Sequence, residues 1–132
     1  DYSMDCVNWS KEFYKELIDE KRVEVYNANV EKLPFENNKF NVVTAVETIY
    51  FWPDLLKSFK EVKRVLKSSG TFIVINEMYI SDKFKEKNDE YVDKMALHTP
   101  EQLKKLFIEV GYKDVSIYVC EENNWMCCSG RA

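Results

Sequence analysis

Glycine, histidine and long apolar runs are all scarce in this chain. Its 132 residues include three glycines and a single histidine, His98. No apolar run approaches the roughly 20 residues that a helix needs to cross a bilayer. The cysteines lack the paired C-x-x-C spacing of zinc sites, so we expect no metal and a reducing, cytoplasmic location. The residues that we expect to be buried structural thiols are Cys6, Cys120, Cys127 and Cys128.

What the chain does contain suits one globular domain. Apolar residues make up 45% and aromatic residues 14% of the sequence. A chain of this length buries roughly two thirds of its unfolded surface, so a core is available. Charged residues make up 32%, with a net charge of −4. Because phosphate binding needs a clustered excess of Lys and Arg, we expect no nucleic acid as a partner. The lack of a long apolar run makes us expect no membrane either.

The first part of the chain is expected to hold one helix and one short strand. Apolar residues recur with helical spacing from Met4 to Lys21, and Ser3 or Asp5 can cap the first turn. Residues 23–26 alternate β-branched and polar side chains and predict a strand. The members of the helix stripe are Cys6, Trp9, Phe13 and Leu17.

The rest of the chain predicts buried strands alternating with helices. Residues 40–46 and 71–76 are almost continuously apolar, as in parallel strands covered on both faces. A helix between them begins near Asp54, and Gly70 follows its end. The motif Thr-Pro-Glu-Gln starting at Thr99 is a capping box for another helix.

The C-terminal residues predict a hairpin that closes the sheet. Residues 115–120 and 125–129 read as strands, and the polar turn Glu121–Asn124 joins them. The complete pattern predicts an α/β fold, a mostly parallel sheet with a C-terminal antiparallel hairpin.

One stretch carries a family resemblance. Val23–Ala45 reads VEVYNANVEKLPFENNKFNVVTA, in which a polar loop with Leu-Pro-Phe separates two apolar segments. It resembles the middle of class I S-adenosylmethionine (SAM)-dependent methyltransferases of the small-molecule type, which read roughly D-A-x-x-L-P-F…F-D-V-V. The resemblance extends over the chain and implies a Rossmann-like sheet. Asn29 and Asn41 stand where the family usually has Asp.

The resemblance implies a cofactor site. Asp1, in a D-x-S element with Ser3, would accept hydrogen bonds from both ribose hydroxyls of SAM. Asn29 would accept from the adenine amino group, and the backbone amide of Val30 would reach an adenine ring nitrogen. Glu47 follows a buried strand, where α/β sheets bind ligands, and would face the methionine end. The plainer alternatives are a helix cap for Asp1 and an ordinary turn residue for Asn29.

Aromatic residues are candidates for the methyl-acceptor site. A sulfonium is cationic, and aromatic faces attract cations by roughly 0.5–2 kcal/mol. Tyr50, Phe51 or Trp52 could therefore lie near the reacting group, and Tyr79 could join them; packing in the core is the alternative. Residues 79–97 are either a lid over the acceptor or a solvated charged helix. No catalytic base is assigned, because Glu47, Glu77, Tyr79 and His98 are each better explained as structural.

The glycine-rich loop that the family places after its first strand does not occur here. None of Gly70, Gly111 and Gly130 opens a strand-to-helix turn near the start. The resemblance therefore implies that residues 1–132 are the C-terminal part of a methyltransferase domain acting on a small molecule, and that they are inactive alone. We expect a second copy, a rearranged strand or an absent N-terminal piece to cover the open sheet edge. The alternatives are a non-catalytic interaction or dimerisation module and, with no positive feature, a nicotinamide-binding Rossmann domain.

Overall fold

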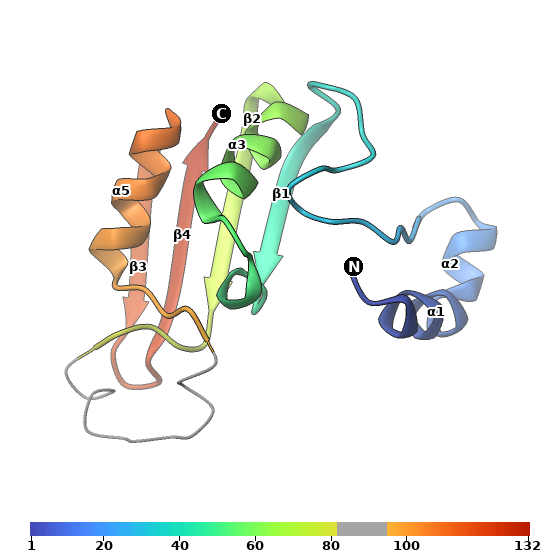
Figure 1. Cartoon of the computed structure of the whole chain (residues 1–132), viewed down its shortest axis with the longest axis horizontal. Coiled ribbons are helices and arrows are strands. Elements are labelled where there is room, and N and C mark those ends of the chain that lie inside the picture. The colour runs from blue at the N-terminus through green and yellow to red at the C-terminus, as the bar shows by residue number, and fades with distance from the viewer. Residues whose placement is uncertain (82–94) are drawn as a thin grey trace.

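The computed structural model describes residues 1–81 and 95–132 (Figure 1). Within these ranges, the helices are α1 (Met4–Phe13), α2 (Lys15–Asp19), the 3-10 helix η1 (Ile49–Phe51), α3 (Leu55–Val65) and α5 (Pro100–Val110). The strands there are β1 (Phe40–Val46), β2 (Leu66–Asn76), β3 (Lys113–Cys120) and β4 (Trp125–Arg131). Neither range contains a helix that is long and apolar enough to cross a membrane.

The described strands form one mixed sheet in the order β1-β2-β4-β3. β1 and β2 are parallel, whereas β4 is antiparallel to both β2 and β3. The α/β class is therefore confirmed, and so is the C-terminal hairpin. The described sheet is mixed rather than mostly parallel, because β4 returns between β2 and β3 and contributes two antiparallel pairs.

The helix caps form as the sequence predicts. Asp54 accepts a hydrogen bond from the backbone N–H of Lys57 and starts α3. At α5, Thr99 and Gln102 each accept from the other's backbone N–H, which is a complete capping box. Gly111 ends α5 at a φ of 88°, a left-handed conformation that glycine adopts without strain.

The core lies between the sheet and the helices α3 and α5, which cover the same face (Figure 1). Phe59 on α3, Phe72 on β2 and Phe107 on α5 are fully buried. The ring centroids of Phe59 lie 5.0 Å from those of both Phe72 and Phe107, with edge-on geometry. Such aromatic contacts add to the free energy of burial, so this cluster anchors both helices on the sheet.

The N-terminal segment differs from its prediction. The single expected helix breaks at Tyr14 into α1 and α2, which stand apart from the sheet in Figure 1. Trp9 and Phe13 are 63% and 66% exposed, so most of the predicted apolar stripe is not buried in a core. Residues 23–26 form no strand. The carbonyl of Tyr26 accepts from the ammonium group of Asp1 instead of joining a strand ladder.

The prediction of buried thiols is wrong for two of the four cysteines. Cys6 on α1 and Cys120 at the end of β3 are exposed, and Cys127 is only partly buried. Cys128 is buried against the aromatic core, and this burial raises the pKa of its thiol to about 12. In residues 1–81 and 95–132, no group of three or more His, Cys, Asp or Glu side chains could hold a metal ion.

Candidate functional site

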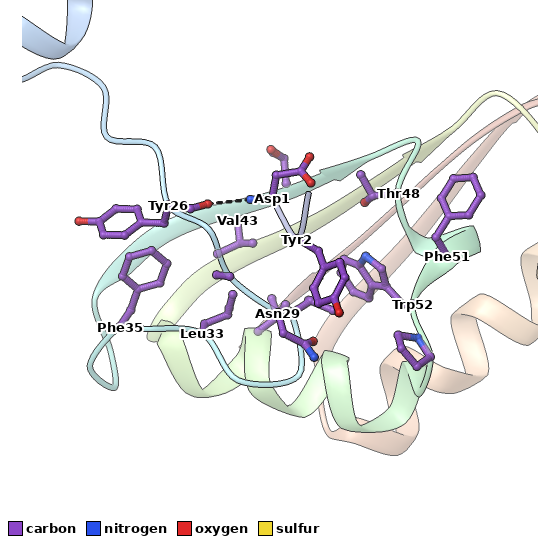
Figure 2. A pocket seen from close by; sticks show the side chains of 15 residues that line it. Asp1, Tyr2, Tyr26, Asn29, Leu33, Phe35, Val43, Thr48, Phe51 and Trp52 are labelled. Carbon is purple, nitrogen blue, oxygen red and sulfur yellow. Dashed lines mark hydrogen bonds between the residues drawn. The ribbon is translucent and has the colours of Figure 1, made fainter. Parts of the chain in front are cut away.

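A cavity of about 830 Å³ lies between the N-terminal segment and β1 (Figure 2). It is bounded by the first two residues, by the loop before β1, by β1 itself and by the residues that lead from β1 into α3. Its lining residues are Asp1, Tyr2, Tyr26, Ala28, Asn29, Val30, Leu33, Phe35, Val43, Thr44, Thr48, Phe51, Trp52, Pro53 and Val62.

Asp1 is fixed on the cavity wall by its own backbone. Its ammonium group donates to the carbonyl of Tyr26 at 2.9 Å, and its carbonyl accepts from the N–H of Ala28 at 2.9 Å. Its Oδ1 accepts from the N–H of Ser3 at 2.8 Å. The other carboxylate oxygen has no hydrogen bond within the described structure, so Asp1 can accept from a ligand.

Ser3 lies outside the cavity lining. Its hydroxyl accepts from the N–H of Cys6 at 3.3 Å and caps α1. Its contribution to the site is therefore indirect: its backbone N–H orients the carboxylate of Asp1.

The loop that carries Asn29 and Val30 is held on α3. The N–H of Leu33 donates to Glu61 at 2.8 Å, and Arg64 donates to the carbonyl of Phe35 at 2.8 Å. Arg64 also pairs with Glu61, and this hydrogen bond lowers the pKa of the Glu61 carboxyl. The ion pair thus anchors the loop, which places Asn29 and Val30 on the cavity wall opposite β1.

The side chain of Glu47 contacts residues that follow β1 and β2. Its side chain accepts from the backbone N–H of Glu77 and lies 3.2 Å from the hydroxyl of Tyr50. Its φ of 54° turns the chain away from β1 immediately after the strand. Glu47 itself does not line the cavity described above, whereas the next residue, Thr48, does.

The predicted acceptor-site residues separate into two groups. Tyr50 and Tyr79 are only 4% and 5% exposed and belong to the core, as the alternative interpretation held. Burial raises the pKa of the Tyr50 hydroxyl, which accepts from the N–H of Met78 at 3.1 Å. Trp52, in contrast, lines the cavity beside Phe51 (Figure 2). Of the proposed lid, residues 82–94 lie outside the described residues.

Sequence reasoning missed several residues of the cavity. Leu33 and Phe35 served only as markers of a family motif, yet their side chains form part of the apolar wall. Two large apolar residues inside an otherwise polar loop indicate that the loop packs against another surface, because such side chains are usually buried. Tyr2 and Thr48 are neighbours in sequence of Asp1 and Glu47, and that proximity was the only clue to them.

Comparisons with known proteins agree on one family. A family model described as "Methyltransferase domain" matches residues 1–74. The chain is 36% identical to the sterol 4-C-methyltransferase of Caenorhabditis elegans over 70 residues, which is 53% of this chain and 21% of that protein. It is 26% identical to the demethylmenaquinone methyltransferase of Staphylococcus saprophyticus over 141 aligned positions, covering 89% of this chain and 59% of that protein. The chain thus spans less than two thirds of the length of these relatives.

Solved structures show the same fold. A SAM-dependent methyltransferase of Thermotoga maritima, a possible histamine N-methyltransferase, superposes with a TM-score of 0.73 at 22% identity, covering 91% of this chain and 69% of that one. The geranyl diphosphate C-methyltransferase of Streptomyces coelicolor, in complex with S-adenosyl-L-homocysteine, gives a TM-score of 0.80 at 12% identity and covers 98% of this chain and 62% of that one.

Proposed function

Because the chain belongs to the methyltransferase-domain family, we propose that it is part of an enzyme that transfers a methyl group from SAM to a small molecule. The family model covers residues 1–74, which include every residue that lines the cavity. Relatives named for sterols and demethylmenaquinone support a small-molecule acceptor. A structural neighbour in complex with S-adenosyl-L-homocysteine (SAH) supports SAM as the methyl donor.

The observation that carries this proposal is that Asp1, Asn29 and Thr48, from three separate segments, line one cavity. Its volume of about 830 Å³ lies within the roughly 300–1,000 Å³ typical of ligand pockets. The free oxygen of Asp1 suits a ribose hydroxyl, since a carboxylate only accepts. The exposed face of Phe51 and the ring of Trp52 suit a cationic sulfonium.

Methyl transfer from SAM requires little of the side chains beyond orienting the two reactants. SAM supplies an electrophilic methyl group on a sulfonium, and its transfer is an in-line displacement. Holding two reactants in line within a cavity that excludes water accounts for much of the rate enhancement in such reactions. The Asp1 and Asn29 walls would fix the nucleoside, while the apolar residues of the loop and β1 exclude water.

We propose further that these 132 residues alone bind SAM weakly and transfer no methyl group. Among the described residues that line the cavity, Asp1 is the only one with an ionised side chain. The lining therefore offers no cationic side chain for the methionine carboxylate and, apart from Asp1, no ionised side chain that could act as a general base for an acceptor that holds its proton tightly.

Binding of SAH, measured by calorimetry and by NMR titration, tests the cofactor site. We expect a Kd of about 0.1–1 mM, equivalent to roughly −4 to −5.5 kcal/mol. Asp1→Asn should weaken binding about tenfold, since a hydrogen bond to a charged group contributes roughly 1.5–3 kcal/mol. Asp5→Asn, in the first turn of α1 and outside the cavity, is the matched control. No binding at 10 mM would refute the cofactor site, and micromolar binding would refute the weak affinity.

The open edge of β1 supports a second proposal, that two copies of the chain associate there. In the described sheet β1 pairs only with β2, and Val42 and Val46 are 53% and 51% exposed. The strand carries no charge, although charged residues usually protect exposed edges from pairing. A second copy fits because antiparallel pairing centred on Val43 places Lys39 opposite Glu47 of the partner subunit.

Sedimentation velocity tests the association. We expect dimers that Val42→Lys dissociates, because two like charges would meet near the centre of the new pair. The control is Val119→Lys, which should leave the dimer intact. Val119 lies on β3, at the other edge of the described sheet, and its side chain is 44% exposed. A wild-type monomer at all concentrations, or dissociation by Val119→Lys instead, would refute the proposed edge.

A further inference from the structure

A second groove, the N-terminal groove, lies apart from the cavity of the candidate site. It is formed by α1, by α2 and by the residues that follow α2. Its volume of about 520 Å³ lies within the roughly 300–1,000 Å³ typical of small-molecule pockets. Its lining residues are Lys11, Lys15, Ile18, Lys21, Val23, Glu24, Val25 and Tyr26. Of these, Tyr26 alone also lines the candidate cofactor cavity.

The N-terminal groove is positively charged. In the part of the chain that the structure describes, no carboxylate forms an ion pair with Lys11, Lys15 or Lys21. Glu24 is the one acidic residue of the described lining, and its carboxylate accepts from the hydroxyl of Tyr26. Three cations against one carboxylate leave the described lining at +2, whereas the whole chain carries −4. Cations held around one groove repel each other, so an anion placed among them is favoured.

The rest of the lining is largely aliphatic. Ile18, Val23 and Val25 line the groove and are only partly buried. A ligand that covers these side chains removes apolar surface from water, which favours binding. A ligand that fits both parts of the lining therefore combines an anionic group with a short hydrocarbon chain. A phosphate monoester carries about −1.5 to −2 at pH 7, which matches the charge of the lining.

We propose that the N-terminal groove binds a small phosphate monoester with an apolar substituent, and that this ligand strengthens cofactor binding in the neighbouring cavity. The carbonyl of Tyr26 accepts from the ammonium group of Asp1 at 2.9 Å. The ring of Tyr26 packs edge-on against Phe35, with centroids 5.1 Å apart. A ligand that orders Tyr26 therefore also orders the cavity wall that carries Asp1. This second part rests on the proposed function, whereas the groove itself does not.

Titration with hexyl phosphate, followed by NMR, tests the groove. The amides of Ile18, Val23 and Val25 should shift along one saturation curve, with a Kd of about 0.5–5 mM. Inorganic phosphate lacks the chain and hexanol lacks the charge, so each should bind at least about tenfold more weakly. Lys15→Gln should weaken hexyl phosphate about two- to fivefold. Lys60→Gln, on α3 outside the groove, is the matched control and should change nothing.

Four results would overturn the groove as a site for such an ester. They are the absence of a saturable shift with hexyl phosphate, equal affinity for phosphate or hexanol, equal effects of the two lysine variants, and cosedimentation of the chain with phosphatidic acid vesicles. The last result would assign the lysines to a lipid headgroup instead of a soluble ester.

The connection to the cavity has its own measurement. Saturating hexyl phosphate should slow hydrogen exchange at the amide of Ala28, which donates to the carbonyl of Asp1. It should also tighten SAH binding about fivefold or more. An unchanged exchange rate or an unchanged SAH affinity would overturn the connection. Failure of the wild-type chain to bind SAH at all would overturn the proposed function, while the titration and the exchange rate still decide on the groove.

Discussion

The N-terminal residues 1–28 and the sheet with α3 and α5 contain similar side chains in opposite environments. Phe107 on α5 is fully buried, whereas Phe13 on α1 is 66% exposed. Val7 is the only buried residue of α1, although the apolar residues of α1 are spaced much like those of α3. Helical spacing therefore does not by itself provide a core, because most helix stability comes from the surface on which the apolar face packs.

The candidate site lies where these two regions meet. Asp1 and Tyr26 come from the loosely packed region, while Val43 lies on β1 and Thr48 just after it. The loop between them is tied to α3 through Glu61. One wall of the cavity is therefore backed by the packed core, and the other is held by a few hydrogen bonds.

The largest expected effect sets Phe107→Ala against Phe13→Ala. Phe107→Ala should reduce the free energy of unfolding by about 3–5 kcal/mol, because it leaves a cavity in the aromatic cluster. Phe13→Ala, the same change on an exposed face, should stay within about 0.5 kcal/mol. Urea unfolding followed by circular dichroism measures both. Equal losses would erase the proposed difference between the two regions.

Gly130→Ala should have the next largest effect. A Cβ at Gly130 would lie 2.7 Å from Cδ1 of Phe107 and 3.0 Å from Cβ of Tyr112. Overpacking of this kind destabilises a core by about 1–3 kcal/mol. Ser129→Ala, the preceding residue of β4, is the control. Equal stability of the two variants would mean that β4 approaches α5 less closely than the structure shows.

Glu61→Ala tests the connection between the loop and α3. The backbone N–H of Leu33 would lose its acceptor, which should destabilise the chain by about 1–2 kcal/mol and weaken SAH binding. Arg64 lowers the pKa of the Glu61 carboxyl in the folded chain. The stability that Glu61 contributes should therefore be complete above the pKa of this carboxyl in the unfolded chain, and be lost as the pH falls through its pKa in the folded chain. Glu20→Ala, which breaks the exposed pair with Arg22, is the control. Unchanged SAH affinity in Glu61→Ala would exclude a role for this anchor in the site.

The smallest expected effect is a pH dependence from His98. Burial lowers the pKa of its ring, and no described residue bonds to its Nδ1. The unfolded chain therefore takes up a proton near its ordinary pKa of about 6.5 before the folded chain does. Stability should fall as the pH drops from there toward the lowered folded value, by at most about 1.4 kcal/mol per pH unit. Unfolding of His98→Gln between pH 5 and 7 should lack this slope, and an unchanged slope would assign it to other groups.

Local patterns explain what could be predicted from the sequence. The capping box at Thr99 and the strand at 40–46 depend on neighbouring residues, so they appear as expected. The exposure of Trp9 and the missing strand at 23–26 depend on what lies beside them in space, which spacing does not encode.

The same distinction holds for the site. The place of Asp1 and Asn29 on the cavity wall could be predicted, because both belong to motifs of the family. Their position after a strand predicts Tyr50 and Glu47 as site residues, but their side chains turn to the core and to the backbone of Glu77. The orientation of the Asn29 side chain could not be predicted, since it follows from the hydrogen bond that its Oδ1 accepts from the backbone N–H of Glu31.

Mapping SAH onto the backbone amides by NMR tests the central claim most directly. If one cavity binds the cofactor, the amides of Asn29, Val30 and Thr48 should shift together along a single saturation curve, and those of the β3–β4 hairpin should not. Shifts confined to the hairpin, or different saturation curves for the loop and for Thr48, would contradict a shared site.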